Sequence, residues 1–209
     1  MKKIKSMFVR NFGGYGQPTE ITPVFTDAEC EEALKNGCAT VKYDGSPVFI
    51  DGDGKLFARF DAKKGNAAPA GAIPCCDPDP VTGHHPHWVP CFDENGNAKS
   101  QYKWHIRAFE NASKLADSLG VPLELNKSYE ALGPHFQGNP YGLPEDILYK
   151  HGADVYKIPD DKRNFDGICE IIKNSPDMEG LVFWLNGEPV CKIKRIDMGL
   201  EWNGKATKR

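Results

Sequence analysis

The stretch CATVKYDGSPVFIDGDGKLFARFD, residues 38–61, decides the fold of this 209-residue chain. It contains three short runs rich in β-branched and aromatic residues, and the turn sequence DGDG (51–54) separates the last two. Such runs around an Asp-Gly turn predict antiparallel strands joined by a hairpin. We therefore expect Lys42 at the end of one strand and Ser46 at the start of the next, so that the residues between them lie at a corner of the sheet.

Helices are expected on both sides of this stretch. Thr26 followed by Glu29 predicts a capping box that opens a helix, and Gly37 ends it. Apolar side chains at helical spacing predict another helix over residues 105–119, which Gly120 stops. A further helix is predicted over residues 161–173, with strands over 4–9 and 121–132 and a hairpin over 180–196 that turns at Asn186-Gly187. The mixture predicts an α+β fold with antiparallel sheets and flanking helices.

The composition indicates a globular protein that forms one domain over residues 1–209. Apolar residues make up 40% and charged residues 26%, and the net charge is −3, which argues against coating nucleic acid by bulk charge. No apolar run is long enough to span a membrane, and no signal peptide is recognisable. Seven irregularly spaced cysteines indicate reduced thiols, so we expect a cytoplasmic protein.

Residues 61–100 are rich in Gly, Pro, His and Cys and have no sustained periodicity. A stretch of this length without regular elements predicts a long irregular loop of the kind that forms lids and binding surfaces. Its cysteines and histidines lack the usual spacing of zinc ligands, so zinc is not expected there.

Three short segments carry candidate chemistry: KYDGS (42–46), EGLVF (179–183) and KIK (192–194). A lysine must lose its proton before it can act as a nucleophile, and burial or nearby positive charge favours the neutral amine. Lys192 and Lys194 alternate onto the same side of their strand, so both can supply that charge and contact phosphates. Glu179 is the best candidate to hold a divalent cation, because Mg²⁺ prefers carboxylate, phosphate and water ligands.

These segments, in this order, resemble the covalent nucleotidyltransferases, the superfamily of ATP-dependent DNA and RNA ligases and mRNA capping enzymes. The resemblance implies a single nucleotidyltransferase domain of the ATP-grasp-like ligase adenylation type. It also implies that Lys42 attacks the α-phosphate of a nucleoside triphosphate and becomes a lysyl-nucleotide. Only 15 residues follow Lys194, so we expect no C-terminal OB-fold.

The same resemblance assigns the remaining site residues. Lys192 matches the essential second lysine of the family, and Lys194 is its partner. Asp44 positions the nucleophile or binds a metal-bound water, and Glu130 accepts hydrogen bonds from the ribose. The nucleotide-binding set implied by the resemblance is Val41, Lys42, Asp44, Gly45, Arg59, Glu130, Lys192 and Lys194.

Further segments narrow the resemblance to the vertebrate-type single-domain 5′-to-3′ RNA ligases. They are ARFDAKKG (58–65), IPC (73–75), HHPHWVPC (84–91), GNPYGLP (138–144), HGA (151–153) and GLEW (199–202). Membership of that family implies ATP as cosubstrate, Mg²⁺ or Mn²⁺, and an RNA with 5′-phosphate and 3′-hydroxyl ends. It further implies a lysyl-AMP intermediate, an adenylated RNA 5′ end and a role in RNA repair, and we expect a monomer.

Alternatives remain open. The chain can be read as a DNA ligase or capping-type core, although those relatives carry an OB-fold, or as a non-catalytic module that binds RNA ends. The alternative for Arg59 and Glu130 is that each is simply an exposed strand charge or a member of an ion pair. An RNA track is suggested by basic residues near the two ends of the chain: Lys2, Lys3, Lys5, Arg10, Lys192, Lys194, Arg195, Lys205, Lys208 and Arg209.

Overall fold

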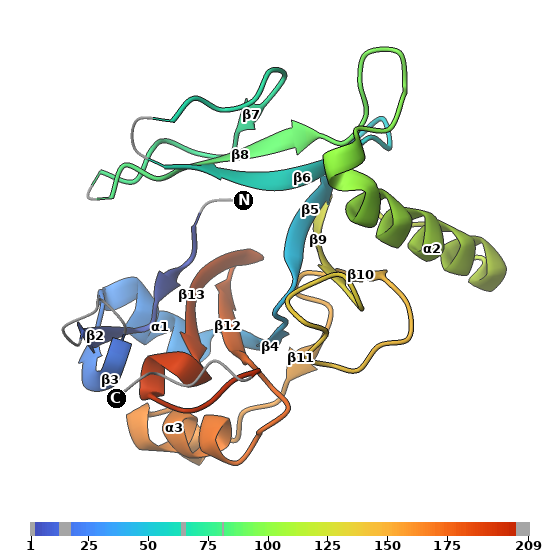
Figure 1. Ribbon diagram of the computed structural model, residues 1–209. Helices are drawn as coiled ribbons and strands as arrows, with labels where there is room; N and C mark the ends of the chain where they lie inside the picture. The colour runs from blue at the N-terminus through green and yellow to red at the C-terminus, as the bar shows by residue number, and fades with distance from the viewer. Residues whose placement is uncertain (1–2, 13–17, 64–65, 81, 204–209) are drawn as a thin grey trace. The chain divides into compact units, whose positions relative to one another are not determined.

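The structure is a computed structural model that describes residues 3–12, 18–63, 66–80 and 82–203 (Figure 1). It is a mixed α+β protein with mainly antiparallel sheets, as the sequence predicts. None of the helices in these ranges combines the length and the apolar character needed to cross a membrane.

The described chain forms two compact units, each with its own sheet and hydrophobic core. Among the described residues, the first unit is built from Lys3 and residues 44–151, and the second unit from residues 4–43 and 152–203. The chain passes between them at Lys3-Ile4, Tyr43-Asp44 and His151-Gly152. The prediction of one domain over residues 1–209 stays a prediction.

The sheet of the second unit has the strand order β1-β13-β12-β4-β11. Its strands are β1 (Lys5–Ser6), β4 (Cys38–Lys42), β11 (Val155–Tyr156), β12 (Gly180–Leu185) and β13 (Glu188–Lys194). All neighbours are antiparallel except β1 and β13. Asn186 and Gly187, at φ 51° and 81°, form the β12–β13 turn, which confirms the predicted hairpin.

Two helices and a two-stranded ribbon pack around that sheet. They are α1 (Ala28–Asn36), α3 (Phe165–Lys173) and the pair β2 (Phe8–Phe12) and β3 (Pro18–Phe25). The second unit also contains two short 3₁₀ helices, η2 (Asp160–Lys162) and η3 (Arg195–Met198). Phe8, Leu34, Ile172 and Phe183 are among the fully or almost fully buried side chains of the resulting core.

The start of α1 differs from the prediction. Asp27, and not Thr26, is the N-cap, because its carboxylate accepts the Cys30 N–H at 3.0 Å. Thr26 instead donates its hydroxyl to the Ser6 carbonyl at 2.7 Å, and Glu29 pairs with Lys5. The expected capping box is therefore wrong by one residue, since the carboxylate next in the chain is the better placed acceptor.

The predicted helix over residues 161–173 begins later than expected. Residues 160–162 form the separate turn η2, and Asn164 then caps α3 by accepting the Gly167 N–H at 2.9 Å. The Asn164 side chain takes the place of a backbone carbonyl as hydrogen-bond acceptor. A separate helix therefore begins after Asn164 instead of continuing from η2.

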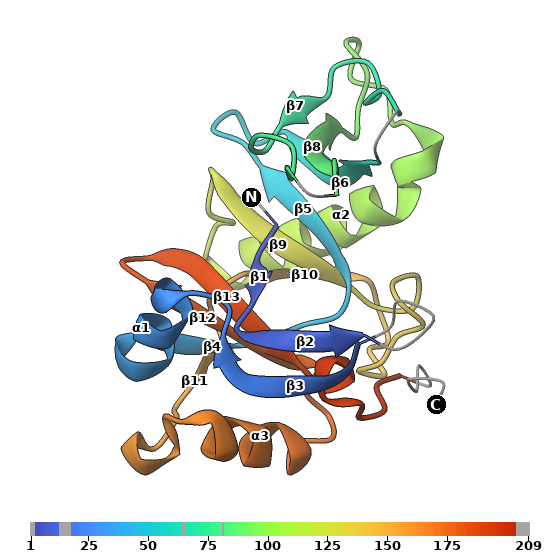
Figure 2. The ribbon, with the colours of Figure 1, turned by 90° about the vertical axis from the view of Figure 1, so that its left-hand side faces the viewer.

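The sheet of the first unit has the strand order β10-β9-β5-β6-β8-β7, all antiparallel. Its strands are β5 (Ser46–Ile50), β6 (Leu56–Ala62), β7 (Ile73–Pro74), β8 (His85–Pro90), β9 (Lys127–Leu132) and β10 (Ile147–Lys150). The β5–β6 hairpin turns at residues 51–54, as predicted. The turn η1 (Ser100–Tyr102) leads into α2 (Lys103–Leu119), which packs along the sheet and ends at Gly120 in the left-handed conformation (Figures 1 and 2).

Residues 61–100 are less irregular than expected. Strand β8 lies inside this segment and pairs along the whole of β6. Pro86 and Pro90 hide the strand in the sequence because proline is rare inside sheets. Both are accommodated here because β7 is short and pairs only with His87 and Trp88.

Candidate active site

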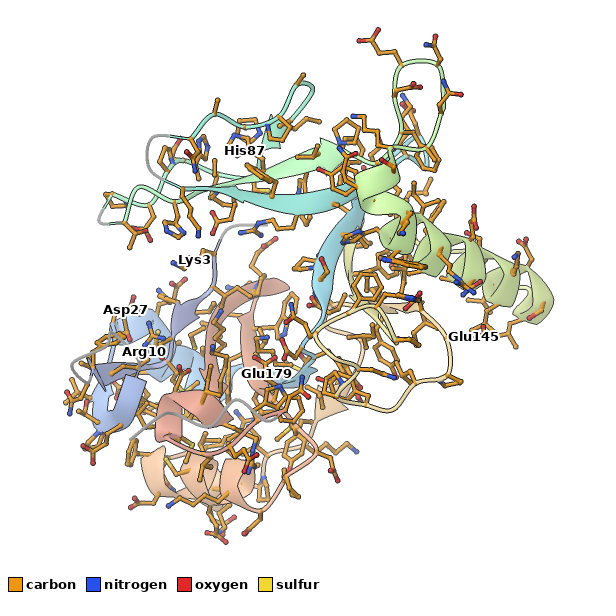
Figure 3. The ribbon with its side chains drawn as sticks, viewed as in Figure 1. Lys3, Arg10, Asp27, His87, Glu145 and Glu179 are labelled. Carbon is orange, nitrogen blue, oxygen red and sulfur yellow. The ribbon has the colours of Figure 1, made fainter. Side chains whose placement is uncertain are left out.

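Lys42 and Glu179 form a close ion pair in the second unit. The Nζ of Lys42 lies 2.5 Å from Glu179 Oε2 and donates to the Tyr43 carbonyl at 3.2 Å. The side chain of Glu179 is only 7% exposed and that of Lys42 is 21% exposed. Figure 3 labels Glu179, which directly precedes β12. A charge pair this close and this buried in the protein interacts far more strongly than one in water.

Strand register explains why these two side chains meet. Gly180 is paired with Lys42 on one side and with Lys194 on the other. A Cβ atom at Gly180 would lie 2.0 Å from the Ile193 carbonyl oxygen, so this position admits only glycine. The Glu-Gly sequence therefore places a carboxylate at the corner where the central strand β12 begins.

Lys192 and Lys194 lie on β13 beside this pair. Lys192 is opposite Val182 in the register, and both lysines face the same side of the strand. The pKa of Lys192 is lowered to about 8, first by burial and then by the positive charges of Lys42 and Lys194, against the opposing effect of Glu179 and Asp197. The structure thus brings together all four residues that the sequence predicted as catalytic.

Asp197 belongs to the same charge cluster, although no pattern in the sequence predicts it there. Its side chain is 1% exposed, and Oδ1 accepts a hydrogen bond from Arg10 Nη1 at 3.3 Å. Its Oδ2 is buried and has no hydrogen-bond partner among the described residues. Nothing in the sequence RIDM marks this aspartate, because its burial depends on how η3 packs against β3.

In the first unit, side chains distant in the sequence hold the turn at residues 44–45, which follows β4 in the chain. The Asp44 N–H donates to the Tyr141 hydroxyl at 2.7 Å, and the Gly45 N–H donates to Glu130 Oε1 at 2.9 Å. The side-chain amide of Gln137 donates to the Gly45 carbonyl at 3.2 Å. A Cβ atom at Gly45 would lie 2.2 Å from the Ala131 carbonyl oxygen, so a glycine is required here as well.

Glu130 is buried and occupied on both oxygens. Besides Gly45, it contacts His151, whose Nε2 lies 2.7 Å from Glu130 Oε2. The other ring nitrogen of His151 lies 2.9 Å from the Ser128 hydroxyl. Glu130 is therefore not an exposed strand charge. In the sequence His151 is part of the segment HGA (151–153), and no local pattern reveals that it reaches Glu130.

The two remaining predicted residues lie in different units. Arg59 is on β6 in the first unit, with its guanidinium 5.8 Å from the ring centroid of Trp88. Val41 is on β4 in the second unit, where its N–H donates to the Asp154 carbonyl at 2.9 Å. Within the second unit, Tyr43 also donates its hydroxyl to Asp154, at 2.6 Å.

The residues around Glu179 fit a divalent cation that takes most of its ligands from substrate phosphates and water. No group of three His, Cys, Asp or Glu side chains placed to hold a metal occurs in the ranges that the structure describes. Glu179 offers a single buried carboxylate beside lysines that attract phosphate. This donor set fits Mg²⁺ or Mn²⁺ held by one carboxylate together with substrate phosphates and water, which is how proteins commonly bind Mg²⁺ with substrate.

Several of the terminal basic residues are already engaged. Lys5 contacts Asp27 and Glu29 at 2.6 and 2.7 Å. Arg10 pairs with Asp197, and Arg195 is buried, donating to the Ile172 carbonyl at 2.6 Å. The charges of Lys5 and Arg10 are thus compensated by acids of the second unit, whereas Arg195 is held by backbone carbonyls. Lys2, Lys205, Lys208 and Arg209 lie outside the described residues.

Comparison with known proteins finds several relatives named RNA ligase 1. No family model matches the chain. RNA ligase 1 from Pongo abelii is 30% identical over 64% of this chain and 47% of its own length. RNA ligase 1 from Danio rerio is 28% identical over 57% of this chain and 42% of its own, and the Rattus norvegicus protein of that name is 26% identical over 89% and 75%. The chain spans about half the length of the first two relatives. These likenesses support a relationship between this chain and the RNA ligases.

Proposed function

We propose that this protein is an ATP-dependent RNA ligase that joins 5′-phosphate and 3′-hydroxyl RNA ends through a lysyl-AMP intermediate on Lys42. The observation that supports this most is the Lys42–Glu179 contact of 2.5 Å, next to a half-buried Lys192. A half-buried amine, a buried carboxylate and further lysines are groups that favour phosphoryl transfer to an amine.

In the proposed first step the neutral amine of Lys42 attacks the α-phosphorus of ATP. A P–N bond forms while the P–O bond to the β-phosphate breaks, and pyrophosphate leaves. The contact with Glu179 holds the amino group in place and gives its proton an acceptor. Lys192 and Lys194 neutralise the negative charge that builds on the phosphates, which stabilises the transition state.

Two further transfers complete the reaction. An oxygen of the RNA 5′-phosphate attacks the phosphorus of lysyl-AMP, and the Lys42 amine leaves and regains a proton. The 3′-hydroxyl then attacks the adenylated 5′-phosphate and expels AMP. Each step is an in-line displacement that depends on placement and charge stabilisation.

The other site residues would bind and orient the nucleotide. Glu130 retains lone pairs beyond those used by Gly45 and His151, so it can also accept ribose hydroxyls. Arg59 offers a planar fork that suits phosphate, and Val41, Asp44 and Gly45 frame the turn beside Lys42. Glu179 would hold Mg²⁺ or Mn²⁺, which when bound supplies positive charge to the triphosphate.

A role in RNA repair, a cytoplasmic location and a monomeric state complete the proposal. The competing assignments make different predictions about the nucleotide. A capping-type enzyme would use GTP, a DNA ligase would prefer DNA ends, and a binding module would form no covalent adduct.

The test is covalent labelling. The protein is mixed with Mg²⁺ and either [α-³²P]ATP or [α-³²P]GTP, then denatured and separated by electrophoresis. We expect label from ATP in the wild type and none in Lys42→Ala, with Lys55→Ala, an exposed lysine in the β5–β6 turn, as the control that keeps its label. Label from GTP alone, or from neither nucleotide, would reject the proposal. Ligation of 5′-phosphorylated RNA against matched DNA then identifies the substrate.

A further inference from the structure

Four side chains on the first unit form a compact group that the active site does not use; we call it the Trp104 cluster: Lys103, Trp104, Arg107 and His135. The imidazole of His135 stacks on the indole of Trp104, with ring centroids 3.4 Å apart and planes 10° from parallel. Lys103 Nζ and the Arg107 guanidinium carbon lie 4.5 and 5.9 Å from the Trp104 ring centroid. Such cation–aromatic contacts restrain long side chains that would otherwise move freely.

The position of His135 is fixed by a buried carboxylate. Asp146 is 2% exposed, and its two oxygens accept from the His135 backbone N–H at 3.2 Å and from Nδ1 at 2.7 Å. Gly133, at φ 132°, permits this turn, because a Cβ there would lie 2.6 Å from the Asp146 backbone. Since a carboxylate only accepts, Nδ1 carries the proton, and Nε2 has no hydrogen-bond partner among the described residues.

The cations of the Trp104 cluster are not neutralised by acidic side chains. Within the described ranges, neither Lys103 nor Arg107 has a carboxylate within 4.0 Å, and both side chains belong to exposed residues. Lys5 and Arg10 of the second unit, by contrast, are held by acids. The cluster thus combines an exposed lysine, an exposed arginine and an oriented imidazole around one indole. The lysine and the arginine are donors for anionic oxygens, and the free nitrogen of the imidazole is an acceptor for hydroxyl groups.

We infer that the Trp104 cluster binds the phosphodiester backbone of the RNA substrate. The inference rests on the proposed function, which supplies RNA as the polyanion. Arg107 can bind one phosphate through its planar fork, Lys103 adds a point charge, and His135 Nε2 can accept a hydrogen bond from a 2′-hydroxyl. Because the donors are exposed and spread around an aromatic ring, they suit successive phosphates of a strand better than one small anion.

The test measures RNA binding by the full chain with fluorescence anisotropy at several salt concentrations. The probe is a labelled single-stranded RNA of about 12 nucleotides with a 5′-phosphate. Each lost phosphate contact lowers the salt slope of log K by about 0.7 for a single strand. We expect Lys103→Ala/Arg107→Ala to reduce the slope by about 1.4 and to weaken binding on the order of tenfold near 0.1 M salt.

The matched control is Lys114→Ala/Lys127→Ala, which removes two positive charges from exposed residues of α2 and β9 in the same unit. We expect this variant to keep most of the wild-type affinity. His135→Asn retains a donor for Asp146 while removing Nε2, so it should weaken RNA binding about threefold without unfolding the protein. An unchanged salt slope in Lys103→Ala/Arg107→Ala, or an equal loss in the control, would overturn the inference.

Two additional measurements separate the possible sources of failure. Displacement of the RNA by inorganic phosphate at millimolar concentration, as well as by unlabelled RNA, would identify a small-anion site and reject the polymer. Labelling by [α-³²P]ATP should be unchanged in all of these variants, because none of them alters the Lys42 cluster. Absence of labelling in the wild type would reject the proposed function, whereas wild-type labelling with unaltered RNA binding in the variants would reject only this inference.

Discussion

His151 Nε2 lies 2.7 Å from Glu130 Oε2, and this contact holds a buried carboxylate whose other oxygen accepts the Gly45 N–H. The two histidine nitrogens bridge Glu130 and Ser128, so the imidazole cannot rotate without losing both contacts. His151 therefore orients the residue that we propose to bind the ribose, and it does so from the last position of the first unit.

We predict that His151→Ala raises the KM for ATP in self-adenylylation about tenfold while kcat changes little, because a buried carboxylate loses one hydrogen bond. His151→Gln should recover most of the loss, since its amide can donate where Nε2 does. The preference for ATP over 2′-deoxy-ATP should fall in His151→Ala and return in His151→Gln. His84→Ala removes an imidazole from the exposed Asp61 pair in the same unit and serves as control. An unchanged preference in folded His151→Ala would contradict the orienting role.

The Lys42–Glu179 ion pair should contribute to the free energy of unfolding as well as to activity. Removing Lys42 leaves a carboxylate that is only 7% exposed without its cation, and the expected loss for Lys42→Met is about 2 kcal/mol of the free energy of unfolding. Lys42→Met/Glu179→Gln should regain most of that loss, because the buried Glu179 charge that Lys42 balances is removed as well. Urea denaturation of the two single variants and the double variant measures the coupling. Additive losses would mean that the two side chains do not interact.

Lys192 should make nucleotide binding depend on pH. Its pKa is lowered to about 8, mainly by burial, so the side chain is largely charged near neutral pH and loses its charge as the pH rises through 8. ATP affinity should therefore fall between about pH 7 and pH 9. Lys192→Arg stays protonated throughout and should show a much flatter profile in equilibrium binding of ATP. Identical profiles in the two proteins would place the titrating group elsewhere.

The same shift has a defined sign for stability. An ordinary lysine has a pKa near 10.5, so between pH 8 and that value the unfolded chain binds more protons at Lys192 than the folded chain does. The contribution of Lys192 to the free energy of unfolding therefore rises with pH across this window and is least favourable below it. Chemical denaturation of the wild type and Lys192→Met should show the variant's advantage near neutral pH shrinking toward pH 10.

Gly45 should tolerate no side chain. A Cβ there would lie 2.2 Å from the Ala131 carbonyl oxygen, which cannot move without breaking the pairing of β5 with β9. We expect Gly45→Ala to lower the free energy of unfolding by at least about 2 kcal/mol and to abolish labelling by ATP. Gly54→Ala is the matched control in the same unit, because its Cβ would meet nothing within 4 Å. It should cost only about 1 kcal/mol for its φ of 78°. Similar effects in both variants would contradict the steric explanation.

Much of the fold could be read from local patterns. The turns at Asn186-Gly187 and at residues 51–54 were predictable from sequence. Asn-Gly and Asp-Gly pairs favour the positive φ angles of hairpin turns almost independently of their surroundings. Helix α2 and its end at Gly120 follow from apolar spacing and one left-handed residue. Strand β8 could not be predicted in this way, because it contains two prolines and proline is rare inside sheets. The prolines are accommodated here because the partner strand β7 is short.

The lysine and glutamate segments could be recognised from the sequence alone. So could the two hairpins and the mixed fold class, since each depends on residues adjacent in the chain. Tertiary structure alone decided that Lys42 meets Glu179 and that His151 reaches Glu130. It also decided that Asp197 is buried and that His135 stacks on Trp104. These contacts arise from strand register and from packing between segments far apart in sequence, and burial then sets the charge behaviour of the side chains. A pattern within one segment contains no information about strand register or about packing between distant segments.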